Sequence, residues 1–162
     1  MASTETERVY ELRHEVADLI ARKELSNAVL RNMDLSGSDL SGQDLRELKL
    51  RQVGLVSVPF TNSRLHAVAF QACGMRSANM RGARLSTVNI FGSELIEASF
   101  ESAVLDRCRI YDSRLGNASF RSARILSTKF QSVEAFRANF ERAMLIHTEF
   151  HDVHMGNAIL SS

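Results

Sequence analysis

Residues 98–120 read ASFES AVLDR CRIYD SRLGN ASF when they are divided into groups of five. The third residue of each group is large and apolar, the first is small, and most of the others are polar. We call this third residue the centre of its repeat. In the same frame, 26 of the 27 centres from Leu30 to Leu160 are Leu, Ile, Met or Phe, and the exception is Ala135. A period of five matches neither an α-helix, at about 3.6 residues, nor a β-strand, at about 2. The pattern therefore predicts a backbone that turns the same face to the interior every five residues.

Two further positional patterns support this interpretation. The residue two places before each centre is Ala, Ser, Thr, Cys or Val in 24 of 27 repeats, and the exceptions are Met33, Gln43 and Leu48. Phe occupies a centre only where the residue number is a multiple of ten, which indicates an even number of repeats per turn. We therefore predict that the small residues and the centres both point inward. The core centres that we single out are Leu40, Phe60, Phe70, Phe100, Phe120, Phe130, Phe140 and Phe150.

The repeat resembles that of the pentapeptide-repeat family, which is written A(D/N)LXX. Close copies of this motif stand at residues 33–37, 78–82, 98–102 and 138–142. The resemblance implies an all-β solenoid, namely a right-handed quadrilateral β-helix with four repeats in each coil. We expect residues 28–162 to form this β-helix.

A helix is predicted before the repeats, over residues 4–25. Thr4 and Glu7 have the spacing of a capping box. The apolar stripe that follows consists of Val9, Leu12, Val16, Leu19 and Ile20. We therefore expect residues 1–27 to be an N-terminal capping helix, because a solenoid needs its open end covered. The alternative is an amphipathic helix that binds a partner.

The composition points away from several functional classes. The chain has 162 residues, a net charge of +1, and no apolar run long enough to cross a membrane. Residues 1–7 are polar and acidic, so we expect no secretory signal. Cys73 and Cys108 both occupy small inward slots, so we expect buried thiols. His147, His151 and His154 are expected to lie in outward slots around the rod. We accordingly predict a cytoplasmic protein that is not an enzyme and uses no cofactor or metal, and we expect no cleft.

Apolar residues also appear where the repeat should be polar, directly after the centres. The positions that we interpret as a candidate partner surface are Phe91, Ile96, Tyr111, Leu126, Phe136 and Ile146. Exposed apolar groups that cluster mark interaction surfaces. This pattern favours a protein-binding or scaffolding role. The alternative is that some of these side chains fold into the core, Phe136 beside the small Ala135 above all.

The last repeats run to Leu160 without a second cap. We therefore expect the chain to form a homodimer that joins at its C-terminal end, because a two-fold contact covers both copies with one surface. The residues of this candidate dimer end are Phe150, Met155, Ile159 and Leu160. A monomer, or a dimer through the surface of Phe91 and Tyr111, is the alternative.

Charge gives a further comparison with the family. Some pentapeptide-repeat proteins resemble a rod of DNA, dimerise end to end, and protect type II topoisomerases from quinolones or toxins. Such proteins usually have a strongly acidic surface, whereas the repeat region here carries 16 basic and 13 acidic side chains. A DNA-mimicking protein that binds DNA gyrase therefore remains the alternative function.

The stretch 61–90 holds four Arg and no acidic residue, which could attract phosphate or be a solvated face. Direct nucleic-acid binding is not expected.

Overall fold

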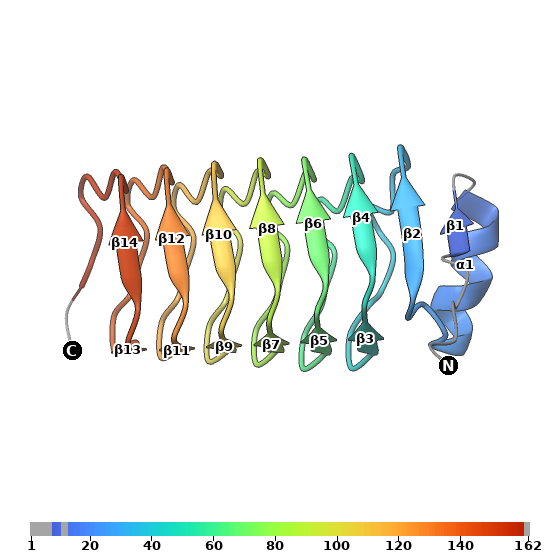
Figure 1. Ribbon diagram of the computed structural model, residues 1–162, viewed down its shortest axis with the longest axis horizontal. Helices are drawn as coiled ribbons and strands as arrows, with labels where there is room; N and C mark the ends of the chain where they lie inside the picture. The colour runs from blue at the N-terminus through green and yellow to red at the C-terminus, as the bar shows by residue number, and fades with distance from the viewer. Residues whose placement is uncertain (1–7, 11–12, 161–162) are drawn as a thin grey trace, which may run out of the picture.

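The computed structural model describes residues 8–10 and 13–160, and it is a parallel β-helix of about seven turns with one short helix near the N-terminus (Figure 1). An eight-stranded sheet has the order β1-β2-β4-β6-β8-β10-β12-β14. Its strands are β1 (Arg8–Tyr10), β2 (Ala28–Arg31), β4 (Lys49–Arg51), β6 (Ala69–Gln71), β8 (Asn89–Phe91), β10 (Arg109–Tyr111), β12 (Lys129–Gln131) and β14 (Glu149–His151). A six-stranded sheet has the order β13-β11-β9-β7-β5-β3. Its strands are β3 (Asp44–Arg46), β5 (Arg64–His66), β7 (Arg84–Ser86), β9 (Val104–Asp106), β11 (Arg124–Leu126) and β13 (Met144–Ile146).

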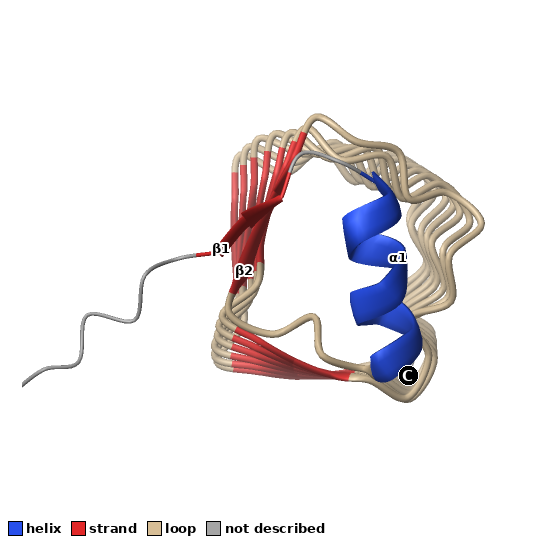
Figure 2. Cartoon of the chain, turned by 90° about the vertical axis from the view of Figure 1, so that its right-hand side faces the viewer, coloured by secondary structure: helices blue, strands red, loops and turns tan. Residues whose placement is uncertain are grey.

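Each strand pairs in parallel with the strand one coil away. Ile110, for example, lies opposite Ile90 on one side and Phe130 on the other, so one coil is twenty residues or four repeats. The two sheets form two adjacent sides of a square outline, and the other two sides are joined through isolated bridges such as Ser99–Ser119 (Figure 2). The predicted quadrilateral β-helix is thereby confirmed.

The corners explain why the repeat has five residues. The second residue after each centre from Leu30 to Met155 has a positive φ, for instance 53° at Arg107 and 56° at Asn117. A single residue in this left-handed conformation turns an extended chain sharply, and the next repeat then begins. Gly adopts this conformation without strain, and Asn and Asp tolerate it. The corner residues are therefore often Gly, Asn, Asp or Ser, although Arg also occurs there.

The centres form the core. All of them from Leu30 to Phe140 are buried, whereas Leu145, Phe150, Met155 and Leu160 are partly or largely exposed in the last coil. The Phe rings stack along the axis, with Phe120 in parallel contact with Phe100 and Phe140 at centroid distances of 4.8 and 4.7 Å. The ring of Phe130 meets that of Phe120 edge-on at 5.9 Å across the interior. Stacked and edge-to-face arrangements are both favourable for aromatic rings, so the two Phe ladders lock the coils together.

The N-terminal segment differs from the prediction of one helix over residues 4–25. Helix α1 is shorter, Arg13–Arg22, and it lies across the open end of the first coil (Figures 1 and 2). Residues 8–10 form β1 instead, in register with β2, so that Tyr10 lies opposite Leu30 and takes the position of a further centre. Val9, which we had placed on the apolar stripe, is therefore in a strand and 48% exposed. Thr4, Glu7 and Leu12 lie outside the described residues.

Helix α1 makes the contacts of a cap. Val16 is fully buried, and Leu19 and Ile20 pack against the first coil. The amide nitrogen of Gln43, an inward residue, donates a hydrogen bond to the carbonyl oxygen of Ile20 at 3.1 Å. A polar residue in this inward slot therefore serves to bind the helix end. No helix among the described residues is long and apolar enough to cross a membrane.

Candidate interaction surfaces and family

The outward apolar residues of the later coils are accessible to different degrees. Phe136 is 46% exposed and Ile146 is 40% exposed, while Phe91, Ile96, Tyr111 and Leu126 are half-buried. Phe136 does not fold into the core, so the alternative that we weighed for it is wrong. Its ring lies over Gly156, where an added Cβ would be only 3.1 Å from the ring. Because Gly156 has no side chain, the ring of Phe136 can lie over it on the surface.

Phe91 and Tyr111 form an aromatic pair on the eight-stranded sheet. They lie opposite each other in β8 and β10, and their ring centroids are 4.8 Å apart with planes tilted by 31°. Together with Ala69, Gln71 and Asn89 they line a shallow hollow of about 340 Å³. An aromatic pair of this kind offers a rigid apolar contact with little entropy to lose on binding.

A second apolar row crosses the six-stranded sheet. Leu126 and Ile146 lie opposite each other in β11 and β13. Ile96 and Phe136 stand two coils apart on one of the bridged sides, with Gly116 between them. The candidate partner residues are thus distributed over three sides of the rod and do not form one patch. The structure brings only the neighbouring pairs together.

The C-terminal coil carries the largest concentration of exposed apolar side chains. Ile159 is 47% and Leu160 is 61% exposed, while Phe150 and Met155 are half-buried. An apolar hollow of about 560 Å³ opens at this end. It is lined by Phe140, Ala143, Leu145, Phe150, Asp152, Val153, Met155 and Leu160. Core-type residues that would meet a following coil are therefore open to contact here.

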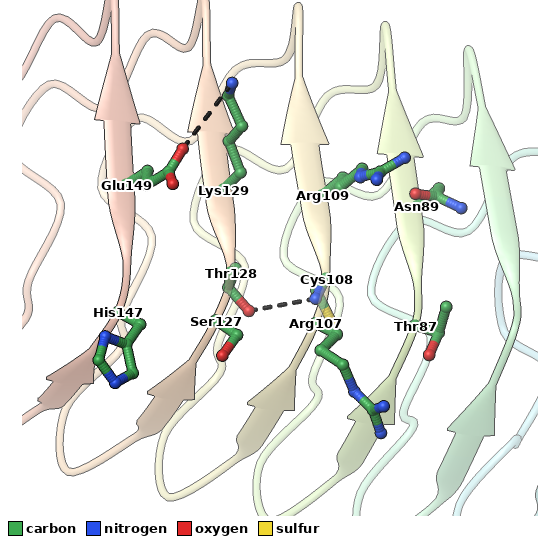
Figure 3. A pocket seen from close by; sticks show the side chains of 10 residues that line it. All are labelled: Thr87, Asn89, Arg107, Cys108, Arg109, Ser127, Thr128, Lys129, His147 and Glu149. Atoms are coloured by element: carbon green, nitrogen blue, oxygen red, sulfur yellow. Dashed lines mark hydrogen bonds and ion pairs between the residues drawn. The ribbon is translucent and has the colours of Figure 1, made fainter.

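A groove also runs along the corner between the two sheets, where we had expected no cleft (Figure 3). Its volume is about 520 Å³. Its lining residues are Thr87, Asn89, Arg107, Cys108, Arg109, Ser127, Thr128, Lys129, His147 and Glu149. The corner residues and the first residues of β8, β10, β12 and β14 supply this lining. A comparison of residues twenty apart in the sequence could have predicted the groove, because it places Asn89, Arg109, Lys129 and Glu149 in one row.

Both thiols lie in the interior. Burial raises the pKa of Cys73, and it raises the pKa of Cys108 from 9.0 to about 11. The thiol of Cys108 donates to the carbonyl oxygen of Leu85 at 3.5 Å, while its own backbone N–H donates to the hydroxyl of Thr128. A thiol with a raised pKa is a weak nucleophile at neutral pH.

The predicted histidine positions are outward. His147, His151 and His154 are all exposed, and His151 contacts Glu149 at 3.1 Å. Within residues 8–10 and 13–160, no group of three or more His, Cys, Asp or Glu side chains is arranged to hold a metal ion. Arg121 and Glu141, one coil apart on the outside of the rod, form an ion pair at 3.1 Å.

A model of the pentapeptide repeats matches eight copies of the repeat in this chain, within residues 24–58 and 83–124. The chain belongs to the pentapeptide-repeat family. Its coils, its inward centres and its left-handed corners form the pentapeptide-repeat β-helix described above. A search of curated proteins found no significant match.

Solved pentapeptide-repeat structures are similar in fold. A trypsin-treated R167E variant of QnrB1, a plasmid-mediated fluoroquinolone resistance protein, has 17% identity and a TM-score of 0.53 over 82% of this chain and 74% of its own. A pentapeptide repeat protein from the Arabidopsis thaliana thylakoid lumen has 25% identity and a TM-score of 0.45 over 70% of this chain and 68% of its own. HetL, from the cyanobacterium Nostoc sp. strain PCC 7120, has 19% identity and a TM-score of 0.34 over 94% of this chain and 93% of its own. At this identity, the match to QnrB1 establishes a common fold.

Proposed function

We propose that this pentapeptide-repeat protein is a non-catalytic protein-binding scaffold that works as a homodimer joined through its C-terminal coil. The observation that carries the proposal is the exposure of core-type side chains at that end, where Leu160 is 61% exposed. Large apolar patches at the surface of a soluble domain mark contact sites. A second copy of the same chain offers an equally apolar end, and a two-fold contact removes both from water.

The Phe91–Tyr111 pair supplies the partner surface in this proposal. Aromatic side chains are enriched among the residues that contribute most to protein interfaces. The pair stands in an outward row of the eight-stranded sheet whose next members are Gln71 and Gln131. The partner surface is thus an apolar centre within a polar row, as in the core and rim of a typical interface.

Affinity capture tests the partner surface. The protein is immobilised and exposed to lysate of its own cells, in parallel with the double variant Phe91→Ser with Tyr111→Ser. We expect proteins that bind the wild type to be lost from this variant. The matched control is Gln131→Ala, at the flanking position of the same row that does not line the hollow, and it should keep them. Equal capture by the double variant, the control and the wild type would remove the Phe91–Tyr111 pair from the proposal.

Protection of a type II topoisomerase such as DNA gyrase is the second candidate. The fold that the chain has in common with QnrB1, a fluoroquinolone resistance protein, supports it. The surface charge does not support it, because the repeat region carries more basic than acidic side chains. A gyrase supercoiling assay with and without quinolone separates the two candidates, since only a topoisomerase-protecting protein restores supercoiling in the presence of the drug.

A further inference from the structure

Charged residues that lie opposite each other one coil apart mostly have opposite charges, and three pairs are exceptions. Several register pairs join opposite charges, and examples are Asp44–Arg64, Glu94–Arg114, Arg114–Glu134 and Lys129–Glu149. Three register pairs stack like charges, and all three are basic: Arg31–Arg51, Arg64–Arg84 and Arg109–Lys129. Like charges directly opposite each other destabilise a sheet. All three pairs lie on the two sheets, so these two sides of the rod have an excess of positive charge.

One of the three like-charged pairs lies in the corner groove. Arg109 and Lys129 are neighbours there, and Arg107 lines the same groove (Figure 3). Lys129 is 3.9 Å from Glu149, and Arg107 is paired with Asp106 at 3.1 Å. Arg109 forms no ion pair and no side-chain hydrogen bond within the described part of the chain. Its guanidinium is therefore the groove's available cation.

Four other polar side chains of the groove are available too. Thr87, Asn89, Ser127 and His147 line it, and none of them forms a side-chain hydrogen bond to another described residue. Hydroxyl, amide and imidazole groups can all donate hydrogen bonds to an oxygen acceptor. The groove thus presents one unpaired guanidinium with Asn89 beside it and further donors along its length (Figure 3), which is a chemical match for a carboxylate.

The groove adjoins the aromatic pair on the same strands. Asn89 and Phe91 are the first and last residues of β8, and Arg109 and Tyr111 are the first and last residues of β10. Side chains two residues apart on a strand point to the same side of a sheet. A ligand that lies across β8 and β10 would therefore meet the rings at one end of each strand and the cation at the other.

We propose that the corner groove and the Phe91–Tyr111 pair together bind an acidic segment of a protein partner, in which a carboxylate side chain stands close to an aromatic or large aliphatic one. The carboxylate contacts Arg109 and Asn89, and the apolar side chain packs on the two rings. This inference rests on the proposed protein-binding function and specifies the partner.

A nucleic acid fits these observations less well. Its affinity comes mainly from many phosphate contacts, whereas Glu149 and Asp106 already neutralise two of the three cations of the groove. A short acidic segment needs one carboxylate contact and one apolar contact, and the surface offers both.

Fluorescence anisotropy with defined probes tests the proposal. The first probe is a labelled peptide with two Phe residues in a background of Glu, the second replaces every Glu with Lys, and the third is a single-stranded oligonucleotide of twelve thymidines. We expect the acidic peptide alone to bind, with an affinity that falls as salt is raised. Arg109→Glu should weaken this binding about tenfold or more, because it removes a charge-assisted contact.

The control is Arg124→Glu. Arg124 begins β11 as Arg109 begins β10, both precede a buried Ile, and Arg124 also forms no ion pair within residues 13–160. This variant changes the net charge equally but leaves the groove intact, so it should bind the peptide within about twofold of the wild type. Matching melting temperatures for the two variants exclude a folding defect.

Three results would overturn the proposal: no binding of the acidic peptide, equal losses with Arg109→Glu and Arg124→Glu, or tighter binding of the oligonucleotide. This test and the capture test of the proposed function can fail independently. If the Phe91 and Tyr111 variant loses its captured partners while Arg109→Glu changes neither capture nor peptide binding, the scaffold function stands and the acidic segment is wrong.

Discussion

At the residue scale, the rod depends on a single position in each repeat. Phe120 touches three other rings, those of Phe100, Phe130 and Phe140. The residue directly after it, Arg121, points outward and pairs with Glu141. Adjacent residues thus have opposite environments, one inward and one outward. Comparing the loss of stability when each is substituted tests which positions point inward.

Phe120→Ala should lower the free energy of unfolding by about 3–5 kcal/mol, because it leaves a cavity in the core and removes stacking partners from two coils. Arg121→Ala should cost less than about 1 kcal/mol, since it removes one partly exposed ion pair. Chemical denaturation followed by circular dichroism measures both. Similar costs for the two variants would show that the inward register is misassigned.

Cys108 makes the stability depend on pH in the alkaline range. Its thiol has a pKa of about 11 in the folded chain and 9.0 when it is not buried. Between these values the unfolded chain loses the proton while the folded chain keeps it, so stability is full below pH 9 and falls as the pH rises towards 11. Cys108→Ala should therefore show a smaller loss of stability over this range than the wild type. Parallel curves for the two proteins would contradict the raised pKa.

At the scale of elements, β1 and α1 close the N-terminal end together. Strand β1 continues the eight-stranded sheet by one strand, and α1 covers the interior of the coil with Val16, Leu19 and Ile20. Covering both the edge and the core of a solenoid protects it from pairing with other chains. The two elements are needed for different reasons. The helix covers the apolar core, whereas only a strand can pair with the backbone N–H and C=O groups at the edge of β2.

Deleting residues 1–25 should cause aggregation or a loss of cooperative unfolding, because it exposes β2 and the first centres. Val16→Asp isolates the contribution of the helix, as it places a charge at a fully buried position and leaves β1 in place. Thermal melting with light scattering measures both effects. A soluble truncated protein with the melting curve of the wild type would show that this segment is not a cap.

At the scale of the whole molecule, the two ends of the rod differ. The N-terminal end is covered by α1, whereas the C-terminal coil exposes Leu145, Ile146, Ile159 and Leu160. An exposed apolar end next to strand edges favours association, and a contact between two such ends closes on itself without forming fibres. The proposed assembly is therefore a dimer and not a filament.

Light scattering after size-exclusion chromatography should give the mass of a dimer at micromolar concentration. Leu160→Asp should shift the protein to a monomer, because the charge would be buried in the contact. Ile96→Asp, on a different part of the rod, is the control and should remain dimeric. A monomeric wild type, or a Leu160→Asp variant that stays dimeric, would contradict the proposed contact.

The sequence by itself determined the repeat and its inward positions, because each repeat is a local unit whose five residues have fixed roles. The four repeats in each coil were implied by the resemblance to the pentapeptide-repeat family. The Phe residues at multiples of ten indicated that the number of repeats per turn is even. The extent of the N-terminal helix was not predictable in this way. An apolar stripe such as that of Val9 and Val16 has the same spacing whether Val9 continues the helix or pairs in a strand with Val29.

Only the tertiary structure decided which outward residues are exposed and where they meet. The corner groove arises because a coil of four repeats brings Arg109 beside Lys129 and turns two sheets against each other at one corner. The ring of Phe136 remains on the surface because Gly156, twenty residues on, leaves room for it. Such contacts join residues a full coil apart, so they depend on the number of repeats per turn and on the packing of neighbouring coils, which no single repeat encodes.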